Sequence, residues 1–263
     1  MNSKALFLSH ASPTLLVETD QPYHRFLKEL GKQIDPSEFD VIVVSSPHFM
    51  VRGRFQVVNT KILRCIQDYY GFPDELYDYC LNAENHTALV ERLLQEASKS
   101  GLNVEPTQRW GLDHGAWVPP LIMWGEVKNK MVAVSTDPYA HEQDYSFGRS
   151  IRMAADSLGL RTLFIASGSP THRLDLFEFG SQPNPHDPLY DFDRILINTL
   201  ENSPQSILEI KRLAGDAYTR SDPEGGLGPL MTAAGFCGDE FRPKILNHDT
   251  PYVGVSVLAA YLN

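Results

Sequence analysis

The chain has 263 residues, of which 42% are hydrophobic and 21% are charged. This is the composition of an ordinary globular protein and excludes a disordered or fibrous one. The formal net charge of -10 argues against a nucleic-acid partner, because nucleic-acid-binding surfaces are usually basic.

The length and the apolar pattern indicate one domain and no membrane partner. No linker or low-complexity stretch divides the chain, so we expect a single domain over residues 1–263. No apolar run is long enough to span a bilayer, and the N-terminus lacks the features of a signal peptide. Cys65, Cys80 and Cys237 are odd in number and show no CxxC spacing, so neither a disulfide framework nor a zinc knuckle is indicated. A cytoplasmic location is the simplest interpretation.

The first elements predicted in chain order are a strand, a helix and a second strand, at residues 5–10, 21–33 and 41–48. Both strands are unbroken apolar runs that end at a histidine, His10 and His48, and such runs are typical of strands buried on both faces. An amphipathic helix with a glycine stop follows at residues 85–101, and a short strand comes after it.

Residues 109–124 carry a further histidine, His114, directly after Asp113. Glycines flank this pair and two prolines follow it, so we expect a rigid loop here rather than an early helix. In the rest of the chain we expect strands at residues 130–136, 162–169 and 252–262. Helices are expected at residues 144–159, 187–202 and 204–214, the last two in succession. The strand at residues 162–169 again leads to a histidine, His172. The alternation predicts an α/β fold with a central sheet flanked by helices.

Histidines that gather at one edge of a sheet indicate a metal centre. Ligands of open α/β sheets bind beyond the carboxyl ends of the strands, which is where these histidines are expected. Two histidines and one carboxylate with open positions are the usual ligands of a non-haem Fe(II) site that binds O2. His10 and His48 are the first two candidates. Glu224, in a tight loop before a helix, is the best local candidate for the third, with Asp222 as its competitor.

Motifs of other enzyme classes are missing from the sequence. The SGSPT stretch lacks the G-x-S-x-G arrangement of a serine hydrolase. PEGGLGP is neither a P-loop nor a dinucleotide fingerprint, and H-E-x-x-H is absent. The remaining histidines lie in predicted helices or polar loops, where we expect surface positions without a role: His24, His86, His141, His186 and His248.

Six segments together resemble the LigB-type, class III extradiol ring-cleavage dioxygenases, and within them the DOPA extradiol dioxygenase group. They run almost end to end: LFLSHASP, VIVVSSPHF, YYGFPDELYD, WGLDHGAWVPPLIM, SGSPTHRL and PEGGLGPLMTAAG. The resemblance implies an α/β core with a mixed, largely parallel sheet, a mononuclear metal in a pocket, and cleavage of a catechol ring beside its two hydroxyls with O2.

The resemblance also implies roles for individual residues. His10 and His48 match metal ligands, and His114 and His172 match the acid/base histidines near the substrate. The DOPA group usually has a further ligand histidine where this chain has Gly225. Other class III enzymes complete the site with a glutamate, so the residue beside that glycine, Glu224, is the expected third ligand. Asp222 and His172 stay open as alternatives.

Four further residues are expected to line the substrate pocket. Tyr70, Phe72 and Trp117 supply aromatic walls. Arg173 stands where the family has asparagine, which favours a substrate with an acid group. The predicted activity is therefore extradiol cleavage of a small catechol-type aromatic, which is DOPA-like, protocatechuate-like or an aminophenol.

The predicted cofactor is Fe(II), with Zn(II) as the alternative. Zinc would favour a hydrolase on the same scaffold, and Gly225 in place of the histidine favours a catalytically silent binding protein. The expected partners are the small aromatic substrate and O2. A homodimer is expected only because such assemblies are common.

Overall fold

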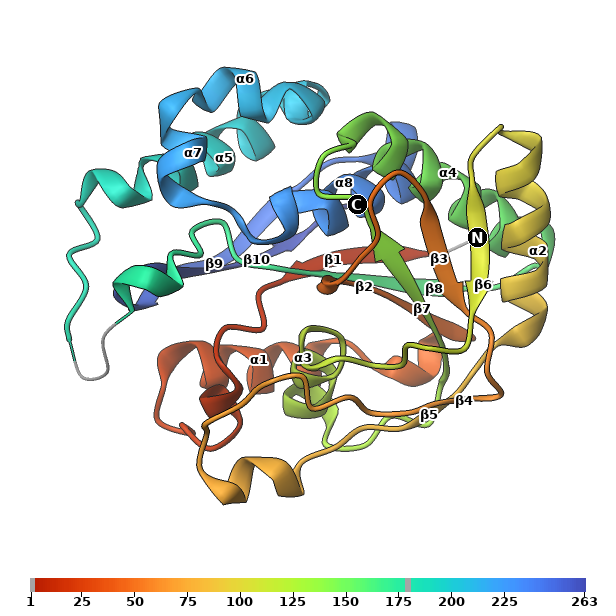
Figure 1. The fold of residues 1–263 in the computed structure, drawn as a ribbon, viewed down its shortest axis with the longest axis horizontal. Helices are drawn as coiled ribbons and strands as arrows, with labels where there is room; N and C mark the ends of the chain where they lie inside the picture. Colours follow the sequence, from red (N-terminus) through yellow and green to blue (C-terminus); the bar gives the residue numbers. More distant parts are fainter. Residues whose placement is uncertain (1–2, 178–180) are drawn as a thin grey trace.

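An eight-stranded sheet forms the centre of this computed structural model, which describes residues 3–177 and 181–263 (Figure 1). The strand order is β6-β3-β7-β2-β8-β1-β10-β9. The strands are β1 (Lys4–Leu8), β2 (Val41–Met50), β3 (Phe55–Val58), β6 (Val104–Thr107), β7 (Lys130–Thr136), β8 (Thr162–Ser167), β9 (Lys244–Tyr252) and β10 (Val255–Tyr261). A separate short ladder pairs β4 (Ile62–Leu63) with β5 (Ala83–Glu84).

The middle of the sheet is parallel and its edges are mixed. β7, β2, β8 and β1 are parallel neighbours, whereas β10 runs antiparallel to β1 and to β9. On the other side, β3 runs antiparallel to β7 and parallel to β6. This mixed, largely parallel sheet confirms the predicted fold class, and its central parallel strands, β7, β2, β8 and β1, are largely buried apolar runs.

Helices cover both faces of the sheet because successive strand residues point to opposite sides. On one face Leu6 and Leu8 of β1 pack with α1 (Pro22–Gln33) and α3 (His114–Trp124). On the other face Phe7 packs with the remaining helices. These are α2 (Thr87–Lys99), α4 (His141–Ser157), α5 (Asp191–Asn202), α6 (Ile210–Ala214), α7 (Asp216–Ser221) and α8 (Gly228–Cys237).

The expected loop at residues 109–124 is wrong, because α3 begins at His114. The carboxylate of Asp113 caps the helix by accepting a hydrogen bond from the backbone N–H of Ala116 at 3.1 Å. Pro119 and Pro120 lie inside the helix and are buried, although each removes a backbone donor. Tertiary packing of this almost wholly apolar segment against α1 and the sheet therefore overrides the local preference of proline.

Most of the other predicted elements are confirmed within two or three residues. The segment predicted as a helix at residues 204–214 begins instead as a 3-10 helix, Pro204–Glu209, and becomes α6 only afterwards. Within residues 3–177 and 181–263, no helix combines the length and the apolar character needed to cross a membrane.

Candidate functional site

Three histidines follow the carboxyl-terminal halves of three neighbouring strands, as the sequence predicts. β2, β8 and β1 lie side by side in the sheet. His10 comes just after β1, and His48 lies near the end of β2, past the point where the pairing of β2 with β7 slips. His172 follows β8 and forms an isolated bridge with Val255 of β10. The order of the strands therefore brings together residues that are far apart in sequence.

The side chains of His10 and His48 meet one oxygen of Glu224. The two Nε2 atoms of the histidines are 3.2 Å apart. Oε1 of Glu224 lies 3.4 Å from Nε2 of His10 and 3.2 Å from Nε2 of His48. Nε2 of His172 lies 3.5 Å from the same oxygen. Asp222, the competing carboxylate, is exposed and lines a different cavity, so Glu224 is the acidic residue that joins this cluster.

The spacing of these three ligand atoms fits a single metal ion. Nitrogen or oxygen ligands about 2.0–2.2 Å from one ion, at tetrahedral to octahedral angles, stand roughly 3.0–3.5 Å apart. The three separations among His10, His48 and Glu224 are 3.2, 3.2 and 3.4 Å. The cluster therefore has the dimensions of one face of a coordination shell.

The other nitrogen of each histidine is held by a partner outside the cluster. Nδ1 of His10 lies 2.8 Å from the hydroxyl of Ser167, and Nδ1 of His48 lies 2.9 Å from Oδ2 of Asp68. With the proton on Nδ1 in both rings, the two Nε2 lone pairs point at the same place as the carboxylate oxygen. Such outer partners are typical of metal-ligating histidines, because they fix the tautomer and the ring orientation.

The charges of the cluster also indicate a place for a cation. Burial raises the pKa of Glu224, but His10 and His172 outweigh it and hold that pKa well below its ordinary value. Burial lowers the pKa of His48, but Asp68 and Glu224 outweigh it and raise that pKa to about 10. The cluster therefore stabilises positive charge beside an ionised carboxylate, and a bound metal ion would supply that charge.

Two glycines set the position of Glu224 in the 3-10 turn Glu224–Leu227. Gly225 and Gly226 have φ angles of 55° and 60°, which side-chain-bearing residues rarely adopt. A Cβ atom on Gly225 would lie 2.7 Å from Cβ of Pro47. Two hydrogen bonds of 3.0 Å hold the turn in place. The backbone N–H of Glu224 donates to the carbonyl of Ser169, and the backbone N–H of Ser169 donates to Oε2 of Glu224. No histidine fits at position 225 in this backbone, so the glycine belongs to the turn that presents Glu224.

Asp68 is a site residue that the sequence analysis missed. Its Oδ1 accepts hydrogen bonds from the backbone N–H and from Nδ1 of His114, both at 2.9 Å, while Oδ2 bonds His48. Burial raises the pKa of Asp68, but these histidine contacts outweigh it and lower that pKa far below its ordinary value. Its position directly before the YYGFPDELYD segment is the signal that could have identified it.

His114 offers an alternative third ligand. His10, His48 and His114 each present a ring nitrogen, and these nitrogens lie within 4.8 Å of one another. Oε1 of Glu224 lies 3.4 Å from Nε2 of His10 and 3.2 Å from Nε2 of His48, whereas Nδ1 of His114 is already bonded to Asp68. We therefore favour Glu224 as the ligand and His114 as a neighbour whose Nε2 is available to a substrate.

A cavity of about 550 Å³ opens over this cluster and is lined by all four histidines. Its volume lies within the range of roughly 300–1,000 Å³ that is usual for small-molecule sites. Tyr70 and Phe72 line it as expected, although the side chain of Tyr70 is 88% exposed at the mouth. Further aromatic walls come from residues that the sequence analysis did not select: Tyr69, Phe177 and Tyr252.

Two residues expected in the pocket wall lie elsewhere. Trp117 is fully buried in the core beneath α3, and its indole N–H donates to the carbonyl of Ile66 at 3.1 Å. The guanidinium of Arg173 is engaged by both carboxylate oxygens of Asp175, at 2.7 and 2.6 Å, and by the carbonyl of Arg220. The expected directions of these two side chains were therefore wrong.

The expectation that the other histidines lie at the surface is wrong for His24. This residue is buried on α1, and its Nδ1 bonds the carbonyl of Leu15 at 2.7 Å. His141 is tied to the carbonyl of Gly226 at 2.6 Å, and His248 to Asp193 at 2.8 Å. These contacts are structural and lie outside the four-histidine cavity.

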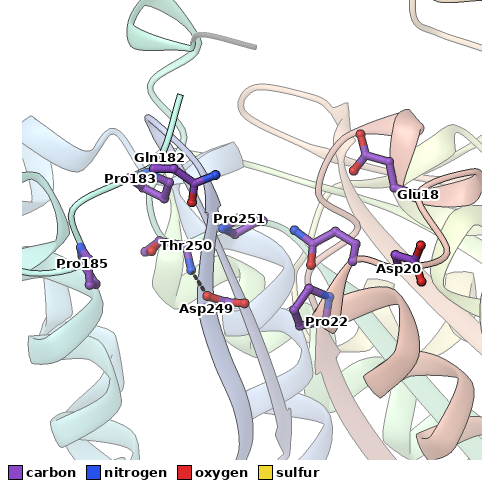
Figure 2. Close-up of a pocket in the computed structure, with 10 residues that line it drawn as sticks. Glu18, Asp20, Pro22, Gln182, Pro183, Pro185, Asp249, Thr250 and Pro251 are labelled. Carbon is purple, nitrogen blue, oxygen red and sulfur yellow. Dashed lines mark hydrogen bonds between the residues drawn. The ribbon is translucent and has the colours of Figure 1, made fainter. Parts of the chain in front are cut away.

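Two other cavities lie beside the site. One, of about 660 Å³, lies between the N-terminal segment and the β9–β10 hairpin and carries the carboxylates of Glu18, Asp20 and Asp249 (Figure 2). The other, of about 600 Å³, lies beyond His172 and Glu224 and carries Arg52, Lys211 and Asp222. Only the 550 Å³ cavity combines the metal-binding geometry with aromatic walls among the residues described.

Comparison with known proteins finds a matching family and several similar proteins. Residues 4–262 match the family described as the catalytic LigB subunit of aromatic ring-opening dioxygenase. A 4,5-DOPA dioxygenase extradiol of Escherichia coli K12 is 31% identical over 185 residues, covering 69% of this chain and 65% of that protein. One of Beta vulgaris is 29% identical over 171 residues, covering 64% of this chain and 62% of that protein. In both cases the match spans less than two thirds of the relative.

Longer matches and a solved structure extend the likeness along the chain. A 4,5-DOPA dioxygenase extradiol of Mirabilis jalapa is 23% identical over 264 residues, covering 97% of this chain and 94% of that protein. The crystal structure of an uncharacterized Escherichia coli K12 protein superposes with a TM-score of 0.77 at 22% identity, covering 99% of this chain and 100% of that one. The structural match establishes a shared fold.

Proposed function

The chain belongs to the LigB family of aromatic ring-opening dioxygenases, and on that premise we propose that it is an extradiol dioxygenase acting on a small catechol-type aromatic with O2. DOPA-like, protocatechuate-like and aminophenol compounds are the candidate substrates. The observation that carries the proposal is the convergence of His10, His48 and Glu224 on one point in the floor of an aromatic pocket.

The proposed cofactor is Fe(II), held by Nε2 of His10, Nε2 of His48 and Oε1 of Glu224. Two histidines and a carboxylate that leave positions open are the set expected for non-haem Fe(II). When bound, the ion would lower the pKa of a catechol hydroxyl and give O2 a place beside the ring. Ser167 and Asp68 contribute by binding Nδ1 of the two rings, which leaves Nε2 of each ring directed at the proposed position of the ion.

Two histidines are free to handle protons of the substrate. His172 lines the cavity, its side chain is 26% exposed, and its Nε2 lies beside Glu224. It is the proposed base that removes a proton from a catechol hydroxyl. His114 is fixed by Asp68 through Nδ1, which directs Nε2 toward the cavity, where it is the proposed acid for the second half of the reaction. Phe72 and Tyr69 line the same cavity and are the proposed aromatic neighbours of the ring.

A zinc-dependent hydrolase is the second candidate, because two histidines and one glutamate also form a catalytic zinc site. A catalytically silent binding protein is less well supported. The absence of a histidine at position 225 gave that alternative its weight, but Gly225 is needed for the turn that presents Glu224. A cytoplasmic location, a homodimeric assembly and the extent of the domain, residues 1–263, stay predictions.

The deciding experiment is O2 uptake after anaerobic loading with Fe(II), using catechol, DOPA, protocatechuate and 2-aminophenol. We expect uptake matched by a coloured ring-fission product, and its loss in His10→Ala and Glu224→Ala. Asp222→Asn, which changes a neighbouring exposed carboxylate, should keep the activity. A protein that binds one metal but consumes no O2 with any of these compounds contradicts the proposal and favours the zinc enzyme.

A further inference from the structure

The cavity over the histidine cluster holds no positive side chain apart from its histidines. Among the described residues that line it there is neither lysine nor arginine. Residues 178–180, which lie outside the described part of the chain, are Glu-Phe-Gly and include no lysine or arginine. The two carboxylates in the lining, Asp68 and Glu224, are both engaged by histidines. A carboxylate on a substrate would therefore find no lysine or arginine partner in the described wall of this cavity.

The guanidinium of Arg173, beside the cavity residue His172 in the sequence, is already engaged. It is held by Asp175 and by the backbone of Arg220. Arg52 and Lys211 line the neighbouring 600 Å³ cavity, which meets the histidine cavity at His172 and Glu224. These two cations therefore face a different space from the one that the catechol ring is proposed to occupy.

A further negative charge lies behind the far wall. The hydroxyl of Tyr252, which lines the cavity, donates a hydrogen bond to Glu18, and Thr14 is its other hydroxyl neighbour, at 3.4 Å. Glu18 belongs to the acidic cavity of Figure 2. The tyrosine hydroxyl is thus committed to a carboxylate and is not available to a polar substituent of the substrate.

Apolar side chains form the part of the wall that is left for a ring substituent. Leu174, Phe177 and Val255 line the cavity together with Phe72. We propose that the cavity selects a catechol whose substituent is uncharged and apolar, in contrast to the amino-acid side chain of DOPA. This inference rests on the function proposed above. Its physical basis is that a buried charge without a partner is costly, whereas a hydrocarbon substituent gains by leaving water.

Three catechols with two-carbon substituents test the proposal: 4-ethylcatechol, 3,4-dihydroxyphenylacetate and dopamine, which are neutral, anionic and cationic. For the Fe(II)-loaded protein we expect kcat/KM for 4-ethylcatechol to exceed both others by about tenfold or more. Calorimetric titration of the same protein without O2 should give the same order of affinity. A higher kcat/KM or a tighter affinity for either charged compound overturns the inference.

A positive charge added at the edge of the cavity provides a second test. Leu174 is 61% exposed at the edge of the cavity, so Leu174→Arg adds a guanidinium there without emptying the core. We expect it to raise the affinity for 3,4-dihydroxyphenylacetate about tenfold and to leave 4-ethylcatechol nearly unchanged. Leu213→Arg is the matched control, because Leu213 is exposed on α6 and absent from the cavity lining. An unchanged affinity for the anion in Leu174→Arg contradicts the assignment of this wall to the substituent.

The two proposals fail in different ways. Tight binding of 4-ethylcatechol without O2 consumption contradicts the dioxygenase function and leaves the preference for a neutral substituent standing. A preference for the anionic catechol that disappears in Arg52→Gln and Lys211→Gln shows that the substituent reaches the neighbouring cavity. In that case the inference falls and the dioxygenase function stands.

Discussion

Two buried carboxylates of this protein differ in what surrounds them. Glu224 is 7% exposed and meets the Nε2 atoms of three histidines, whereas Asp144 is fully buried on α4 among hydroxyl groups and a backbone N–H. Burial raises the pKa of both groups, but only at Glu224 do nearby imidazoles outweigh it. The pKa of Asp144 stays well above its ordinary value.

The two carboxylates therefore differ in their contacts: Glu224 faces imidazole nitrogens, whereas Asp144 links elements of the fold. Oδ1 of Asp144 accepts hydrogen bonds from Thr136, from Thr232 and from the backbone of Asp137, while Oδ2 has no partner among the described residues. These hydrogen bonds join β7, α4 and α8. Glu224 instead points one oxygen at ligand atoms from two strand ends. Burial alone therefore does not distinguish the two carboxylates, whereas the convergence of several imidazole nitrogens on one oxygen does.

The largest expected effect comes from removing the charge of Glu224. Glu224→Gln keeps the shape of the side chain but places an amide beside two imidazole lone pairs. We expect Fe(II) affinity to fall by more than the roughly 10–100-fold that is typical of losing an outer partner, and O2 uptake to be lost. Competition with a chromogenic chelator measures the affinity. Asp144→Asn is the matched control, and a comparable loss of Fe(II) affinity there would remove the distinction between the two carboxylates.

Asp68→Asn sharpens the comparison, because Asp68 orients two of the histidines and is not itself a proposed ligand. We expect Fe(II) affinity and kcat each to fall by about 10–100-fold. Asp78→Asn changes an exposed carboxylate at the end of the same loop region and should have no such effect. Metal competition assays and O2-uptake kinetics give the two numbers separately. Wild-type affinity in Asp68→Asn would mean that the rings are held by packing alone.

Gly225→Ala tests whether the turn that presents Glu224 depends on glycine. A methyl group at position 225 meets Pro47 at 2.7 Å and requires a φ of 55°, so we expect a loss of about 2 kcal/mol or more in the free energy of unfolding. Gly159→Ala is the control, because Gly159 has a φ of 69° but open space around it. Its loss should be only about 1 kcal/mol, from backbone strain. Equal losses of unfolding free energy for the two variants, measured with urea, would show that the contact with Pro47 adds no measurable cost.

How much of the site is predictable follows from how each residue is positioned. His10, His48 and His172 follow apolar strands, and the rule that ligands bind at carboxyl ends of strands was enough to bring them together. Glu224 was recognisable from its glycines. Asp68 was not, because it lies in a loop after the short strand β4, where no periodic pattern places it near His114. The orientations of Trp117 and Arg173 depend on tertiary partners, and so does the helical state of Pro119 and Pro120.

Asp144 should also make the free energy of unfolding depend on pH. Its pKa is raised in the folded protein, so it binds a proton there at pH values where the unfolded chain, with a pKa near 3.9, has lost it. Its contribution to stability is therefore complete below about pH 3.9 and is lost as the pH rises through the folded pKa.

Asp144→Asn removes this titration while keeping the oxygen that accepts from Thr136. The free energy of unfolding of the variant, relative to wild type, should accordingly rise with pH, by on the order of 1 kcal/mol for each unit between the unfolded and folded pKa values. Urea unfolding of both proteins at half-unit steps from pH 4 to pH 8 measures the difference. A difference that is flat with pH would mean that Asp144 is ionised in the folded protein, like Glu224, and that a buried carboxylate needs no imidazole to stay charged here.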